Sequence, residues 1–206
     1  MHSGPQFVVL SGMLGSGKTS LVESLLASAS ASDTAIIVNE AGEINIDGAV
    51  LSESAGGMSM ATLSNGCVCC SLTSDLVTTV QDLVESRRLT GQGPFSRIIL
   101  ECSGLSRPGP VVASLQELAV LSFKLHLITT YDCSRPALQT AEFDDAVAQL
   151  AGANTIVLTK IDLVPSEKRV LVRLVVEQFR ANALLGIGVD RFCGLVDLEV
   201  GVELLA

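Results

Sequence analysis

The clearest chemical signal is the stretch GMLGSGKT at positions 12–19, which matches the pattern G-x-x-x-x-G-K-[ST]. An apolar run leads into it and a helical pattern leaves it, as a phosphate-binding loop requires. Backbone N–H groups exposed by the glycines would hold phosphates, Lys18 would reach the β- and γ-phosphates, and the Thr19 hydroxyl would bind Mg²⁺. We therefore predict a nucleoside triphosphate site. Its expected residues are Gly12, Leu14, Gly15, Ser16, Gly17, Lys18, Thr19 and Ser20.

A second motif, Thr159-Lys160-Ile161-Asp162, follows an apolar segment late in the chain. A carboxylate such as Asp162 can accept two hydrogen bonds from guanine N1–H and N2–H₂, a donor pair that adenine lacks. The aliphatic stem of Lys160 can cover the plane of the base. We therefore expect guanine recognition by Thr159, Lys160 and Asp162. A solvated Lys–Asp pair in a loop is the alternative.

Between these motifs lies the run Glu101-Cys102-Ser103-Gly104-Leu105. Glu101 ends an apolar segment and can hold Mg²⁺ directly or through water, unless it is an ordinary carboxylate before a turn. The backbone N–H of Gly104 can contact the γ-phosphate. We assign catalytic roles to Lys18, Glu101 and Gly104. Leu105 stands where Ras-like enzymes have a glutamine that orients the attacking water, so we expect slow intrinsic hydrolysis.

Three thiols gather at Cys67, Cys69 and Cys70, just before a predicted helix. Thiols at this spacing can converge on one soft cation and leave a fourth position open, which suits metal exchange better than structural stapling. The alternative is a buried turn that uses cysteine as a small hydrophobic residue. We expect the remaining cysteines to serve only packing; they are Cys102, Cys133 and Cys193.

These residues need a scaffold, and the hydrophobic pattern predicts one. Short apolar segments indicate buried strands over residues 7–11, 35–39, 97–101, 125–129 and 154–158. Longer segments indicate helices over residues 18–29, 73–88, 136–150 and 166–183. Their alternation favours an α/β fold with a mostly parallel sheet covered by helices on both faces. The stretch 42–66 is too irregular for one helix and suits a mobile or ligand-ordered segment. His126 lies in a predicted strand and should be a packed or hydrogen-bonded residue rather than a metal ligand.

The composition narrows the class of protein. Of 206 residues, 48% are hydrophobic and 17% charged, which supplies a core and excludes a disordered chain. The 13 Lys+Arg against 22 Asp+Glu give a net charge of −9, so we expect no nucleic-acid partner. No apolar stretch approaches the ~20 residues of a membrane-spanning helix. We expect no signal peptide, reduced thiols and a cytoplasmic location.

Taken together, the motifs closely resemble the CobW-like family of P-loop GTPases, which is related to the nickel chaperones UreG and HypB. The matching stretches run in order along residues 7–164: GMLGSGKTS, VNEAGE, IDG, NGCVCC, ECSGLSRP and TKID. The resemblance implies a P-loop NTPase three-layer sandwich with a mostly parallel central sheet flanked by helices. We expect one GTPase domain over residues 1–206, without the further C-terminal domain that is usual in the family.

The resemblance implies a GTPase that binds a transition metal and passes it to a client protein or cofactor pathway, such as cobalamin biosynthesis. The family's C-x-C-C cysteines bind Zn²⁺ or a related metal, so Cys67, Cys69 and Cys70 inherit that role, with Glu40 as a fourth ligand. Zinc is favoured, and cobalt or nickel stays open. The implied cofactors are therefore GTP, Mg²⁺ and Zn²⁺ (or Co²⁺ or Ni²⁺). GTP binding and hydrolysis would then gate metal affinity.

Other interpretations stay open. The chain could be a regulatory GTP-binding module with little turnover and no metal transfer. An ATP-dependent kinase would share the phosphate loop but would explain neither TKID nor the thiols. Thr159 replaces the asparagine more usual in the family, which bears on guanine selectivity. Related GTPases often pair through their nucleotide faces, which leaves a nucleotide-dependent homodimer open beside an unidentified client metalloprotein.

Overall fold

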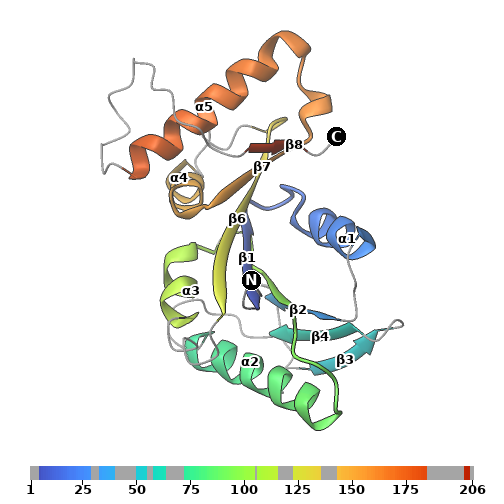
Figure 1. Cartoon of the computed structure of the whole chain (residues 1–206). Coiled ribbons are helices and arrows are strands. Elements are labelled where there is room, and N and C mark those ends of the chain that lie inside the picture. The colour runs from blue at the N-terminus through green and yellow to red at the C-terminus, as the bar shows by residue number, and fades with distance from the viewer. Residues whose placement is uncertain are drawn as a thin grey trace.

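The computed structural model describes residues 5–28, 33–39, 50–54, 58–63, 72–104, 106–115, 123–135, 143–184 and 202–204. Its strands are β1 (Gln6–Gly12), β2 (Thr34–Asn39), β3 (Val50–Ser54), β4 (Met58–Leu63), β5 (Arg97–Glu101), β6 (Lys124–Asp132), β7 (Thr155–Thr159) and β8 (Val202–Leu204). Within the described residues they form one sheet in the order β3-β4-β2-β5-β1-β6-β7-β8 (Figure 1). β3 runs antiparallel to β4, and the other neighbouring pairs are parallel.

Helices connect most of the parallel strands. They are α1 (Lys18–Ser28), α2 (Leu72–Leu89), α3 (Pro108–Leu115), α4 (Phe143–Gly152) and α5 (Ser166–Leu184), with a short 3₁₀ turn, η4 (Ile161–Leu163), after β7. In Figure 1, α1 lies on one side of the sheet, and α2 and α3 lie on the other. This confirms the expected three-layer sandwich with a mostly parallel sheet. In the described part of the chain, no helix is long and apolar enough to cross a membrane.

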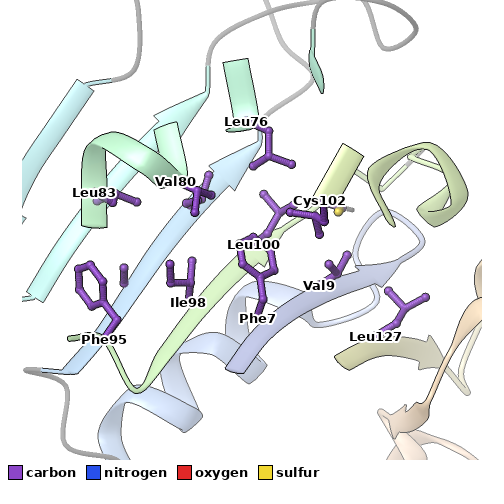
Figure 2. Packing of buried hydrophobic residues seen from close by; sticks show 13 residues of the cluster. Phe7, Val9, Leu76, Val80, Leu83, Phe95, Ile98, Leu100, Cys102 and Leu127 are labelled. Carbon is purple, nitrogen blue, oxygen red and sulfur yellow. The ribbon is translucent and has the colours of Figure 1, made fainter. Parts of the chain in front are cut away.

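Alternating residues of the central strands explain why helices cover both faces. In β1, Phe7 and Val9 pack into the cluster beneath α2, whereas Val8 and Leu10 pack against α1. Successive side chains of a strand point to opposite faces, so an uninterrupted apolar strand needs a cover on each side. Figure 2 shows the first cluster, in which the strand residues Phe7, Val9, Ile98 and Leu100 meet Leu76, Val80 and Leu83 of α2.

The observed strands and helices agree with those predicted from the hydrophobic pattern, except in the stretches where that pattern is irregular. All five predicted strands are present, and the helix expected over 136–150 is described from Phe143. The expectation of an irregular segment over 42–66 is wrong for residues 50–54 and 58–63, which pair as β3 and β4. β3 is a short edge strand with two serines, and β4, between β3 and β2, mixes apolar and small polar residues, so neither carries the uniformly apolar run that marked the other strands. α3 and β8 also went unpredicted, although Pro108 suits the first position of a helix.

The parallel register collects functional side chains at one edge of the sheet. Gly12 at the end of β1 pairs with Thr130 of β6, and Asp132 of β6 pairs with Thr159 of β7. Glu101 ends β5, the neighbour of β1 on its other side. Ligands of open α/β sheets bind beyond the carboxyl ends of the strands, so this edge is where a nucleotide would lie.

Candidate functional site

The loop between β1 and α1 depends on its glycines. Gly12 has a φ of 141°, and a Cβ atom there would lie 2.2 Å from Thr130 Oγ1. Gly17 has a φ of 90°, in the region where side chains are disfavoured. The Ser16 hydroxyl contacts that of Thr130 at 2.6 Å, which fastens the loop to β6. The predicted phosphate loop is therefore held against β6, with no room for a side chain at Gly12 and a backbone at Gly17 that favours glycine.

Lys18 begins α1 and is buried. Its Nζ donates to the carbonyl oxygens of Gly12 at 2.9 Å and Met13 at 3.0 Å. Burial lowers the pKa of the Lys18 ammonium, and the nearby Glu101 carboxylate opposes that shift. The ammonium thus spans the mouth of the loop, where phosphate oxygens would be stronger partners than neutral carbonyls.

Thr19 and Glu101 meet across the gap between α1 and β5. The Thr19 hydroxyl donates to Glu101 Oε1 at 2.7 Å, and Glu101 is buried at the end of its strand. A hydroxyl and a carboxylate placed together beside a phosphate loop are hard oxygen donors of the kind that Mg²⁺ prefers. The arrangement fits the predicted magnesium role of both residues.

A cavity of about 770 Å³ opens over these groups. Its lining residues are Leu14, Gly15, Gly17, Lys18, Thr19, Ser20, Val38, Asn39, Glu101, Cys102, Ser103, Gly104 and Lys160. Gly104 lies close against the phosphate loop, since a Cβ atom there would be 2.6 Å from the Leu14 nitrogen. The structure therefore brings the predicted residues Lys18, Glu101 and Gly104 to one cavity.

The predicted base-recognition residues contact the same loop. Lys160 adopts a left-handed backbone with a φ of 54°, and its Nζ donates to the Gly15 carbonyl at 2.7 Å. The Thr159 hydroxyl donates to the Ser16 carbonyl at 2.7 Å. Asp162 follows in η4 and is exposed. The threonine at position 159 therefore ties the strand end to the phosphate loop.

Asp132, which the sequence analysis did not single out, completes this side of the site. Its Oδ2 lies 2.6 Å from Lys160 Nζ, and its Oδ1 accepts from the backbone and hydroxyl of Ser134 at 2.9 and 2.6 Å. Burial opposes ionisation, but the hydrogen bonds from Lys160 and Ser134 outweigh it and hold the pKa of the Asp132 carboxyl below its usual range. Asp132 is an acidic residue at the end of a strand, like Glu101, and this position in the sequence could have been used to predict it.

Replacing Asp132 with asparagine should lower the free energy of unfolding near neutral pH by about 1–2 kcal/mol, because charge-assisted hydrogen bonds to Lys160 and Ser134 are weakened. Since the carboxyl pKa is depressed by folding, this stabilisation is present above the unfolded pKa of ~3.9 and is lost as the pH falls through the folded value. Urea unfolding of wild type and variant should therefore converge once the pH has fallen below the lowered, folded-state pKa of Asp132. Asp144→Asn, an exposed change on α4, serves as control; an equal loss there would contradict the assignment.

The remaining predicted residues fare differently. His126 is exposed, so it is not packed in the core, but the expected hydrogen bond is present: its Nε2 lies 2.9 Å from Thr155 Oγ1 on β7. Cys102 and Cys133 are buried free thiols, and burial raises their pKa to about 12 and about 11, as expected for packing residues. Other predicted residues lie outside the described part of the chain: Glu40, Cys67, Cys69, Cys70, Leu105 and Cys193. Among the residues that are described, no group of three or more His, Cys, Asp or Glu could hold a metal.

Comparison with known proteins, like the geometry of the site, indicates a nucleotide-binding domain. The family description "CobW/HypB/UreG, nucleotide-binding domain" matches residues 6–184. The zinc chaperone YjiA of Escherichia coli is 32% identical over 169 residues, which cover 81% of this chain and 52% of YjiA. The zinc-regulated GTPase metalloprotein activator 1 of Schizosaccharomyces pombe is 30% identical over 173 residues, covering 80% of this chain and 41% of that protein. The chain thus spans about half the length of these relatives, or less.

Solved structures show the same likeness. The crystal structure of the Zn(II)-bound YjiA GTPase from E. coli superposes with a TM-score of 0.60 at 25% identity, covering 83% of this chain and 54% of that one. The hydrogenase maturation factor HypB of Archaeoglobus fulgidus superposes with a TM-score of 0.52 at 17% identity, covering 89% and 77%. The second likeness concerns the fold alone.

Proposed function

The chain belongs to the CobW/HypB/UreG family of nucleotide-binding domains, and from that premise we propose that it binds GTP, hydrolyses it slowly and couples hydrolysis to transition-metal delivery. One observation carries the nucleotide part of this proposal. Lys18, Thr19 and Glu101 converge at the mouth of a glycine loop, with the Thr19 hydroxyl 2.7 Å from the Glu101 carboxylate. A cation and hard oxygen donors beside such a loop suit a magnesium–triphosphate complex.

Each group has a separate task in hydrolysis. Lys18 would move its hydrogen bonds from loop carbonyls to phosphate oxygens and stabilise charge that develops in the transition state. Thr19 and Glu101 would hold Mg²⁺, which supplies charge neutralisation at the phosphates when bound. The Gly104 N–H would bind the γ-phosphate. With Leu105 in place of a water-orienting glutamine, we expect slow turnover.

Guanine selectivity would depend on the η4 turn. Asp162 is exposed near the loop end of β7, where its carboxylate can accept from the guanine N1–H and N2–H₂ groups. Lys160 is held at two points, by Asp132 and by the Gly15 carbonyl, so its aliphatic stem has a defined direction. These contacts order the base-recognition turn before the base arrives.

The metal part of the proposal rests on the sequence and on the relatives. Cys67, Cys69 and Cys70 form the thiol cluster, and Glu40 supplies a carboxylate. Two related proteins are named as a zinc chaperone and a zinc-regulated metalloprotein activator, which favours zinc as the cargo. The described strand β2 ends at Asn39, which lines the nucleotide cavity, immediately before Glu40. One proposed metal ligand, Glu40, therefore follows directly after a residue of the nucleotide cavity, which is the connection through which we expect nucleotide state to influence metal affinity.

Zinc binding measured with GDP and with a non-hydrolysable GTP analogue tests this coupling. We expect the wild type to show a zinc affinity that differs between the two nucleotide states by about 5-fold or more. The Cys67→Ser/Cys69→Ser/Cys70→Ser variant should bind zinc at least ~100-fold more weakly, because thiolates are lost. Cys133→Ser, which removes a buried thiol elsewhere, is the matched control and should bind as the wild type does.

Two results would contradict the metal role. Equal zinc affinity with either nucleotide would remove the coupling and leave a GTP-binding module. Unchanged binding in the triple variant would show that zinc is held elsewhere. Because both results leave GTP binding and hydrolysis intact, they separate the failure of metal delivery from the failure of nucleotide chemistry.

A further inference from the structure

Gln149 is a buried polar residue that the chemistry above does not use. It lies on α4 with 1% of its side chain exposed. Its Nε2 donates to two backbone carbonyls, those of Gly104 and Ser106, each at 3.1 Å. An amide that serves two acceptors at this depth is costly to leave unpaired. The two bonds join α4 to the segment that carries the proposed γ-phosphate contact.

Two further contacts follow the same face of α4. Asp145, four residues before Gln149, accepts from Arg107 Nε at 2.8 Å. Gly152, three residues after it, approaches Pro108, whose Cγ would lie 3.4 Å from a Cβ at position 152. Positions separated by four and then three residues share one face of a helix. Residues 145, 149 and 152 therefore form a seam on α4 that faces Gly104, Ser106, Arg107 and Pro108.

Contacts to β6 hold the seam in place, and the phosphate loop lies against the residues that the seam contacts. The backbone carbonyl of Gln149 accepts from the Thr129 hydroxyl of β6 at 2.9 Å, which fixes this turn of α4 to the sheet. On its far side Gly104 presses against Leu14 of the phosphate loop. The Ser106 N–H also donates to the Ser103 carbonyl at 3.0 Å. Gly104 thus lies between the phosphate loop and an amide that is itself held in place.

We propose that Gln149 is a positioning residue that lets this protein distinguish GTP from GDP. It holds the carbonyls of Gly104 and Ser106 toward α4 and so keeps Gly104 against the phosphate loop, where its N–H can meet a γ-phosphate. GDP lacks that phosphate and gains nothing from the arrangement. This inference rests on the γ-phosphate role proposed for Gly104, and it assigns the structural control of that role to α4.

Nucleotide affinities of Gln149 variants test the proposal. Gln149→Met keeps the length of the side chain but removes both donors, and Gln149→Asn keeps an amide that is one methylene too short. With Mg²⁺ present, we expect either change to weaken binding of a non-hydrolysable GTP analogue by about 10- to 100-fold and GDP by less than about 3-fold. A purely structural role would not change the ratio of the two affinities.

Val147→Ala is the matched control, because it removes a packed side chain of α4 and keeps both the Gln149 amide and its anchor at Thr129. It should lower thermal stability and leave the affinity ratio at the wild-type value. A wild-type ratio in the Gln149 variants, or equal loss of both nucleotides, overturns the inference, and if the methionine variant does not fold the asparagine variant decides. A wild type that shows no extra affinity for the triphosphate overturns the Gly104 role and this inference together.

Discussion

Replacing Lys18 with methionine should lower the rate of GTP hydrolysis by about 10³-fold, measured as phosphate release in single-turnover assays. Methionine has a similar length but carries no charge, so the stabilisation of developing negative charge on the phosphates is lost. The wild-type ammonium already lies at the mouth of the loop, bonded to the carbonyls of Gly12 and Met13. The Lys18 ammonium can therefore reach phosphate oxygens without a change in the backbone, so its removal takes away an interaction that is already positioned for catalysis.

The folded state should survive this change. Burial already disfavours the charged form of Lys18, as its lowered pKa shows, so methionine at this position relieves a desolvation cost. We expect thermal stability near or above that of the wild type. Lys168→Met, on the exposed first turn of α5, is the control and should hydrolyse GTP at the wild-type rate. Hydrolysis by Lys18→Met within about 10-fold of wild type would remove this loop from the catalytic mechanism.

Replacing Gly104 with alanine should have the second-largest effect, a loss of about 10²-fold in hydrolysis with GDP affinity preserved within a few-fold. The added Cβ would lie 2.6 Å from the nitrogen and 2.8 Å from the Cα of Leu14, both backbone atoms that cannot swing aside. The segment must therefore move away from the phosphate loop. That movement carries the Gly104 N–H away from the γ-phosphate but leaves the contacts to the other phosphates unchanged.

Gly109→Ala is the matched control for this prediction. A Cβ there meets no atom within 4 Å, and the position belongs to α3, five residues along the chain. Alanine favours the helix, so stability should rise slightly and hydrolysis should not change. The Gly104 assignment is wrong if both variants hydrolyse GTP alike, or if Gly104→Ala loses GDP and the GTP analogue to the same extent.

Much of the candidate site could be predicted from the sequence because its motifs consist of neighbouring residues. The phosphate loop, the TKID turn and the Glu101 strand end are each a few residues long, and their function follows from residue type and spacing. The apolar strands were equally clear, because a sheet buried on both faces requires nearly every residue to be apolar. β3 and β4 were not predicted for the opposite reason: the edge strand β3 and its neighbour β4 mix apolar residues with Ser and Thr and so show no continuous apolar run.

The partners of those motifs depended on tertiary structure. Asp132 and Lys160 are separated by 28 residues, yet the β6–β7 register brings them to 2.6 Å. Gln149 and Gly104 are 45 residues apart and meet because α4 packs beside the segment that follows β5. Such long-range contacts are set by strand order, register and helix packing, none of which leaves a local pattern in the chain.

The sequence by itself therefore indicated the chemistry that we propose for this protein: a triphosphate loop, a turn expected to recognise guanine and a thiol cluster, each encoded by neighbouring residues. Only the tertiary structure decided how the residues of the proposed nucleotide site are held, with Thr159 tying β7 to the phosphate loop and Gln149 joining Gly104 and Ser106 to α4. The physical reason is that a motif needs only local backbone geometry. The orientation of its side chains needs partners that folding alone brings within hydrogen-bonding distance.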